Sequence, residues 1–161
     1  MRKDESRMRV SAFADIEKDF LARVRQIVWC NVATVDRRGR PRSRILHPIW
    51  EGRTGWILTG RHTLKTRHLA ANPHVSLCYA TGDLQQVYVD CRAEWADDPA
   101  DKTRLWDLFA SIPPPIGYDP IAFWPRGKED PTFGVLRLTP WRIEITSLAD
   151  LVSGTGRIWH A

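Results

Sequence analysis

An alternation of apolar and polar residues over 85–95 is the feature that most constrains the fold. The apolar residues occupy every second position: Val87, Val89, Cys91 and Ala93. Successive side chains of an extended chain point to opposite faces, so this spacing predicts a long strand with one buried face. A short turn, Thr81-Gly-Asp83, joins it to an apolar run over 74–80, which predicts an antiparallel pair.

The rest of the chain predicts more strands and three helices. Further strands are expected at 29–35, 40–50, 56–59, 132–138 and 141–146. The expected helices are 11–28 with Ser11 as a cap, a short one from Thr63 or Leu64 to the stop at Asn72-Pro73, and one opened by Asp98-Pro99. Short turns between consecutive strands favour antiparallel pairing. The predicted fold is mainly β with peripheral helices, a closed or split barrel of six or seven strands.

The chain is expected to form one domain over 1–161, with no clear periodicity in a tail over 148–161. A loop rich in Pro and Gly over 112–131 is too long for a connector and is expected to cover a site or a subunit interface. No apolar run approaches the length of a membrane span, and the charged N-terminus does not resemble a signal peptide. Three cysteines without metal-ligand spacing favour reduced thiols and a cytoplasmic location.

An anion site is expected where the strand at 56–59 enters a turn rich in hydroxyl groups and positive charge. The turn runs from Thr59 to Lys65 and ends at a helix start. Free N–H groups and the helix dipole favour an anion there, and Thr and Lys side chains add hydrogen bonds. Between residues 37 and 67 there are nine Lys or Arg against one acid, Glu51. A solvated basic face is the alternative interpretation.

The common catalytic signatures are missing. The sequence has no dinucleotide-binding glycine fingerprint, Walker loop, zinc-protease motif or nucleophile elbow. His62 and His68 have no matched acidic partner, so no metal is expected. A protein without evident side-chain catalysts often relies on a cofactor for its chemistry.

The run from Ile57 to Leu77 resembles the flavin-binding core of the pyridoxamine 5'-phosphate oxidase-like superfamily. That core has a strand ending in Thr, then Ser/Thr and Lys, then a helix closing with L-x-x-N-P-x-V/A-S-L. The similarity extends back through 33–41 and 44–47 and forward through 86–94. It covers about residues 12–147.

The resemblance implies a split β-barrel homodimer with FMN sites at the interface. Thr59, Thr63 and Lys65 would hold the FMN phosphate, with Leu58 and Leu64 beside them, and Arg44 would reach the phosphate or ribityl chain. The backbone of Ile45, Leu46 and His47 would run along the isoalloxazine edge, and Gln86 would reach the flavin. Each assignment has a structural alternative: a helix cap for Thr63, a surface lysine for Lys65, a carboxylate partner for Arg44, a packed histidine for His47 and a sheet residue for Gln86.

The sequence departs from the true vitamin B6 oxidases of this superfamily. The segment 108–115 lacks their substrate-phosphate arginines, and Thr146 stands where a Trp would lie. The region 123–131 is closer to the general-stress-protein branch. The expected function is an FMN-dependent oxidoreductase that transfers hydride through flavin N5, with the 112–131 loop as the roof of its pocket. The alternatives are a deazaflavin-dependent reductase, a non-catalytic flavin-binding module and, least favoured, a nucleic-acid binder.

Overall fold

The computed structural model describes residues 7–161. Its strands are β1 (Met8–Val10), β2 (Cys30–Val35), β3 (Pro41–Leu46), β4 (Ile49–Glu51), β5 (Thr54–Gly60), β6 (His74–Ala80), β7 (Gln86–Trp95), β8 (Phe133–Thr146) and β9 (Arg157–His160). Its helices are α1 (Ala14–Ile27), α2 (Leu64–Ala71), α3 (Pro99–Ser111) and α4 (Leu148–Ser153), with short 3-10 turns η2 (Pro120–Ala122) and η3 (Gly127–Glu129). The predicted class, mainly β with peripheral helices, is confirmed.

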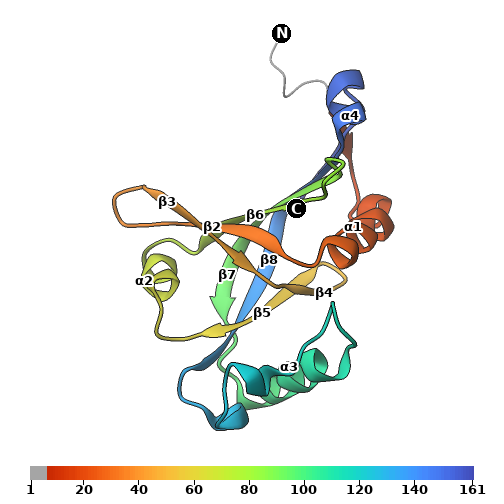
Figure 1. Ribbon diagram of the computed structural model, residues 1–161. Helices are drawn as coiled ribbons and strands as arrows, with labels where there is room; N and C mark the ends of the chain where they lie inside the picture. The colour runs from red at the N-terminus through yellow and green to blue at the C-terminus, as the bar shows by residue number, and fades with distance from the viewer. Residues whose placement is uncertain (1–6) are drawn as a thin grey trace.

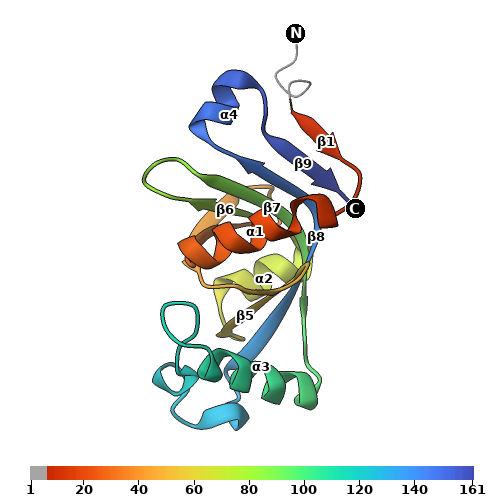
Figure 2. The same ribbon diagram turned by 90° about the vertical axis from the view of Figure 1, so that its right-hand side faces the viewer.

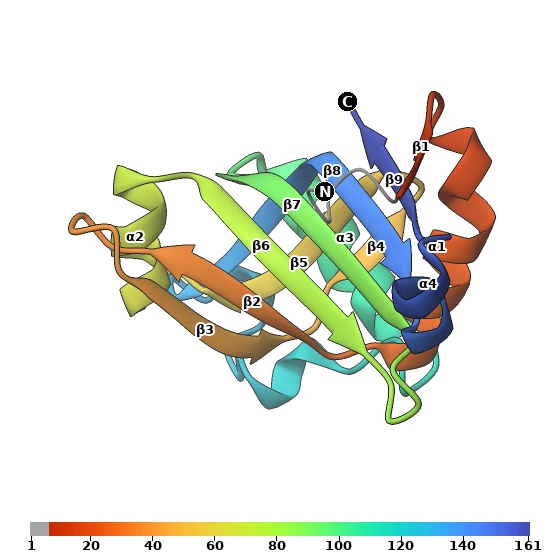
Figure 3. The same cartoon turned by 90° about the horizontal axis from the view of Figure 1, so that it is seen from above.

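All nine strands belong to one sheet that does not close, as expected of a split barrel (Figures 1 and 3). The strand order along its main path is β1-β9-β8-β7-β6-β2-β3. Outside this path, β5 pairs with β8, and β4 pairs with β5. One edge of β8 pairs with β7, while the other pairs first with β5 and then with β9. Every pair is antiparallel except β1 with β9.

The strands differ from the prediction at four places, and the described chain has nine of them where six or seven are expected. β1 has no predicted counterpart. The runs at 132–138 and 141–146 are one strand, β8, because its pairing with β7 continues on both sides of a register shift. The shift lies between the pairs Cys91–Pro140 and Asp90–Arg142 and leaves Trp141 of β8 as the extra residue. The run at 40–50 is instead two strands, since β3 ends at Leu46 and β4 forms a hairpin with β5 after Pro48. The tail, for which no element was predicted, forms α4 and β9, and β9 pairs with β1.

The predicted cap of the first helix is wrong. Helix α1 begins at Ala14 with Phe13 at the N-cap position, and no side chain caps it. The Asp15 carboxylate instead accepts a hydrogen bond from the Ala12 N–H at 3.0 Å. The cap of α3 follows the prediction, because the Asp98 carboxylate accepts hydrogen bonds from the backbone N–H groups of Ala100 and Asp101.

Two apolar clusters hold the fold together. In the larger one, α1 packs Ile16, Phe20 and Val24 against the barrel strands, and the Trp50 indole N–H donates to the Tyr79 hydroxyl at 2.8 Å. In the smaller one, α3 packs against β5, β8 and the 112–131 loop. Figure 2 shows α1 crossing the strands near the middle of the view and α3 lying at their lower end. The alternation in β7 is confirmed, since all four apolar residues on its inner face are buried.

No helix within residues 7–161 is long and apolar enough to cross a membrane. The same part of the chain contains no cluster of His, Cys, Asp or Glu that could hold a metal ion. Cys30, Cys78 and Cys91 are free thiols.

Candidate cofactor site

Two cations without an acidic partner form the centre of the site. Lys65, in the first turn of α2, is only 8% exposed, and Arg44 lies on β3. Within residues 7–161, neither side chain forms an ion pair with a carboxylate. Burial lowers the pKa of both, and the charge of Arg44 lowers the pKa of Lys65 further. A buried ammonium beside a half-buried guanidinium is unfavourable until an anion joins them.

Hydroxyl groups hold both cations in place. Lys65 Nζ donates to Thr63 Oγ1 at 3.0 Å, and Arg44 Nη1 donates to Thr34 Oγ1 at 2.9 Å. The Thr34 hydroxyl also forms a hydrogen bond with His68 Nδ1, 2.9 Å away on α2. This link fixes the helix that carries Lys65 against the strand pair that carries Arg44. The suggested carboxylate partner for Arg44 is absent from the described residues.

The turn before α2 is the predicted anion cradle. Thr63 occupies the N-cap position, yet its side chain makes no capping hydrogen bond. Its hydroxyl instead donates a hydrogen bond to the Gly60 carbonyl at 3.3 Å and accepts one from the Lys65 ammonium. The first turn of α2 contains no acidic residue, so the positive end of the helix dipole is uncompensated by the helix itself.

A hollow of about 250 Å³ lies beside the cradle. Five predicted residues line it together: Ile45, Leu46, His47, Leu58 and Thr59. Gly60 also lines it, and the hydrogen bond from Thr63 to Gly60 connects the hollow to the cradle. We call this space the ring hollow.

Aromatic side chains form the rest of the ring hollow. Tyr118, Phe123 and Trp124 come from the 112–131 loop, and Trp29 comes from the residue before β2. The expected roof over the pocket therefore has a counterpart in the structure. None of these four was named in advance as a site residue; the dense aromatic content of an unusually long loop was the available signal. Flat apolar walls suit a planar ring system.

His47 is packed into the wall of the ring hollow. It is 6% exposed, and its ring lies 4.7 Å from that of Trp29 and 5.2 Å from that of Tyr118, measured between centroids. Its Nε2 lies 2.7 Å from the Ile116 carbonyl, which can only accept, so Nε2 carries the proton. Burial lowers the pKa of His47, which favours the neutral ring.

A family model described as pyridoxamine 5'-phosphate oxidase matches residues 16–147. The chain belongs to the pyridoxamine 5'-phosphate oxidase family. A search of the curated proteins finds no match.

Solved structures share the fold of this family member at low identity. A protein from Clostridium acetobutylicum related to general stress protein 26 has a TM-score of 0.73 and 16% identity, covering 91% of this chain and 94% of its own. An FMN-binding protein from Nostoc punctiforme related to pyridoxamine 5'-phosphate oxidase has a TM-score of 0.61 and 17% identity, covering 87% and 86%. An F420 reductase has a TM-score of 0.54 and 20% identity, covering 76% and 93%.

Gln86 was predicted to reach the flavin, but in this protein it lies away from the predicted site residues of β3. It is on β7, which β6 and β2 separate from β3. Three strand spacings amount to about 14 Å across the sheet. Its side-chain oxygen accepts from the Tyr88 hydroxyl at 3.2 Å, and its backbone carbonyl accepts from Arg23 at 3.1 Å.

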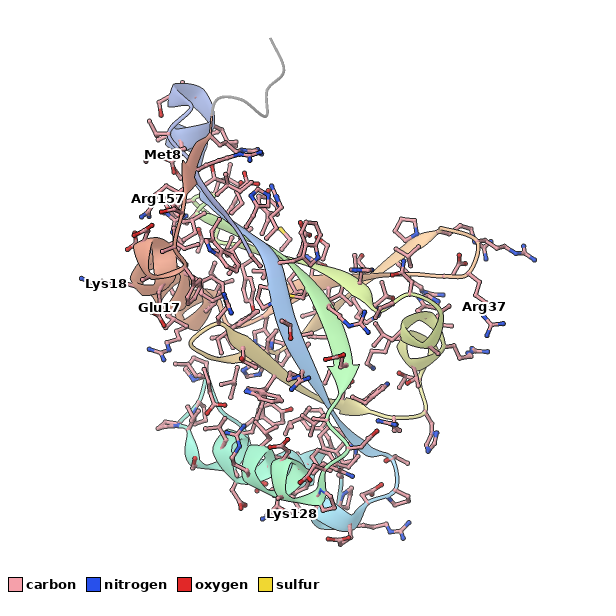
Figure 4. All side chains as sticks on the ribbon, turned by 180° about the vertical axis from the view of Figure 1, so that it is seen from behind. Met8, Glu17, Lys18, Arg37, Lys128 and Arg157 are labelled. Atoms are coloured by element: carbon pink, nitrogen blue, oxygen red, sulfur yellow. The ribbon has the colours of Figure 1, made fainter. Side chains whose placement is uncertain are left out.

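A second, strongly basic hollow lies between α2 and the β2–β3 hairpin. It is lined by Asp36, Arg37, Arg38, Arg40, Leu64, Arg67, His68 and Ala70. Asp36 is already engaged by the backbone and side chain of Arg40, which lower its pKa to about 2. Arg37 lies at the hairpin tip, on the side of α2 (Figure 4). Leu64, which was predicted to lie beside the FMN phosphate, lines this basic hollow and not the ring hollow.

Proposed function

We propose that this protein is an FMN-dependent oxidoreductase that transfers hydride through flavin N5 to or from a small molecule. The observation that carries the proposal is the pair of buried Lys65 and half-buried Arg44, to which residues 7–161 offer no carboxylate partner, next to a turn that leads into an aromatic hollow. FMN has the matching shape, a planar ring joined by a chain to a phosphate dianion. Charge-assisted hydrogen bonds to that dianion would relieve the unfavourable charge pair.

Each part of the site has a distinct task in this proposal. Lys65, Thr63 and Arg44 hold the phosphate, while β3 and the end of β5 align the ring edge through backbone groups. Tyr118, Phe123 and Trp29 exclude water from the ring. The bound flavin supplies the redox chemistry, and the protein supplies binding, orientation and a dry pocket.

A homodimer with the cofactor sites at its interface is part of the proposal. Three large apolar side chains around the ring hollow remain half exposed or more in the single chain: Trp29 at 53%, Ile45 at 56% and Phe123 at 64%. A second copy would cover them and could bring its own Gln86 to the flavin. A cytoplasmic location is also proposed, in keeping with the three free thiols.

The proposal is tested by purifying the protein and recording its visible spectrum before and after titration with FMN. We expect a flavin spectrum and quenching of flavin fluorescence on binding. A protein that neither carries nor binds FMN would contradict the proposal. Pyridoxamine 5'-phosphate itself is not the expected substrate, because the segment 108–115 has no arginine for a substrate phosphate.

A deazaflavin-dependent reductase is the second candidate. The basic hollow favours it, since Arg37, Arg38 and Arg67 face a space next to the cradle and could bind a coenzyme whose anionic chain continues beyond the phosphate. Parallel titrations with FMN and the deazaflavin separate the two candidates. Much tighter FMN binding excludes the deazaflavin version. Flavin binding without turnover of any electron acceptor would indicate the non-catalytic flavin module.

A further inference from the structure

The proposed function assigns no task to Thr34, a buried hydroxyl on β2. Its side chain is 1% exposed, and the other buried residues of this strand, Cys30 and Val32, are apolar. A valine has nearly the same shape as a threonine and would cost less to bury there. Packing alone therefore does not explain a threonine at this position.

The Thr34 hydroxyl binds one particular nitrogen of the Arg44 guanidinium. It accepts a hydrogen bond from Nη1 at 2.9 Å, and Nη1 also donates to the Val32 carbonyl at 3.4 Å. A guanidinium carries five N–H groups, two of which belong to Nη1. Both hydrogens of Nη1 are thus engaged by β2. Within residues 7–161, the N–H groups on Nε and Nη2 have no acceptor.

We propose that Thr34 is a positioning residue that directs the free edge of the Arg44 guanidinium toward the cofactor phosphate. This inference rests on the proposed FMN function. With Nη1 held by β2, the N–H groups left over are those of Nε and Nη2, and this edge of the fork suits two oxygens of one phosphate. His68, which is 7% exposed, holds the same hydroxyl from α2. Thr34 would therefore contribute to phosphate recognition without touching the cofactor.

The test measures the equilibrium affinities of the full-chain protein for FMN and for riboflavin, which lacks the phosphate. The ratio of the two affinities isolates phosphate recognition, because a general loosening of the fold weakens the binding of both ligands. Thr34→Val keeps the shape of the side chain and removes the hydroxyl. We expect it to lower the ratio about tenfold, as for the loss of one charge-assisted contact, and we expect Thr34→Ser to restore the ratio.

Double-mutant cycles identify the group through which Thr34 acts. In an Arg44→Met background, Thr34→Val should leave the ratio unchanged, because the guanidinium that Thr34 positions is gone. In a Lys65→Met background, Thr34→Val should still lower the ratio about tenfold. Thr34→Ala replaces Thr34→Val in these cycles if urea unfolding shows that the valine variant folds poorly.

Thr146→Val is the matched control. Thr146 on β8 is also 1% exposed, and its hydroxyl has no hydrogen-bond partner among the described residues. The substitution removes an equally buried hydroxyl that lies outside the proposed site, so the ratio should stay at the wild-type value.

Three results would overturn the inference: a ratio that Thr34→Val leaves unchanged, a ratio that Thr34→Ser lowers as much as Thr34→Val does, or a full effect of Thr34→Val in the Arg44→Met background. All three leave the proposed FMN site standing, because FMN binding by the wild-type protein is measured first. A wild-type protein that does not bind FMN would instead refute the proposed function, and this inference with it.

Discussion

Lys65 is the residue on which the account depends most. It is buried beside Arg44, and its described hydrogen-bond partner is the neutral hydroxyl of Thr63. The substitution Lys65→Met keeps the length of the side chain and removes the charge. A hydrogen bond to a charged group contributes about 1.5–3 kcal/mol, so FMN affinity should fall by about 10- to 100-fold.

The same substitution should not destabilise the cofactor-free protein, because it removes a buried charge that lacks an ionic partner. Fluorescence titration gives the affinity, and urea unfolding gives the stability. Lys18→Met, on the exposed face of α1, is the control for both measurements. A Lys65→Met protein that binds FMN as tightly as the wild type would show that Lys65 does not contact the phosphate.

The lowered pKa of Lys65 also predicts a pH dependence. Between its folded pKa and the ordinary value of 10.5, the unfolded chain holds more protons than the folded one. The free energy of unfolding contributed by this group therefore rises with pH through that window and levels off above it. Subtracting the Lys65→Met profile from the wild-type profile isolates this contribution. A difference that falls with pH would contradict the assigned direction.

At the scale of elements, the segment 112–118 is held so closely that one methyl group should displace it. A Cβ on Gly117 would lie 1.9 Å from the Ile112 carbonyl oxygen and 2.6 Å from that of Phe109. Gly117→Ala should therefore cost about 1–3 kcal/mol of stability, as other overpacked sites do. Because Tyr118 moves with the segment, FMN affinity should fall as well.

Gly82→Ala is the matched control for Gly117→Ala. Nothing lies within 4 Å of a Cβ at Gly82, which is in the turn between β6 and β7. Urea unfolding of the two variants gives the comparison. Equal stability would mean that the segment adapts freely and does not fix the roof of the ring hollow.

The elements that could be predicted are those whose pattern is local. β6, β7 and α2 follow from alternation, from turn residues and from the Asn72-Pro73 stop. The continuity of β8 depends on its pairing with β7 on both sides of a register shift, and β9 depends on pairing with β1 and β8. Such information lies in distant segments and has no local signature.

The same division applies to the site. Thr63 and Lys65 follow from the order of a strand, a cationic turn and a helix, whereas Arg44 is expected only from the family resemblance. The Thr34–His68 hydrogen bond arises only when α2 packs on β2, and the aromatic roof arises only when the 112–131 loop folds back. These residues can be read from the sequence, but the contacts between them depend on tertiary packing.

At the scale of the whole molecule, the proposed dimer should depend on the apolar surface around the ring hollow. Ile45→Glu places a charge on that surface and should shift the protein from dimer to monomer in sedimentation velocity. Val152, on α4, is 85% exposed, and Val152→Glu serves as the control. A wild-type protein that sediments as a monomer would contradict the dimer proposal.

The most direct test of the account compares the equilibrium affinities of the full-chain protein for FMN and for riboflavin. The two ligands share the ring and the ribityl chain and differ by the phosphate. If Arg44 and Lys65 hold that phosphate, FMN should bind about 100-fold more tightly or better, from two charge-assisted contacts of about 1.5 kcal/mol or more each. Equal affinity for the two would contradict the account, because Arg44 and Lys65 would then have no part in binding the cofactor.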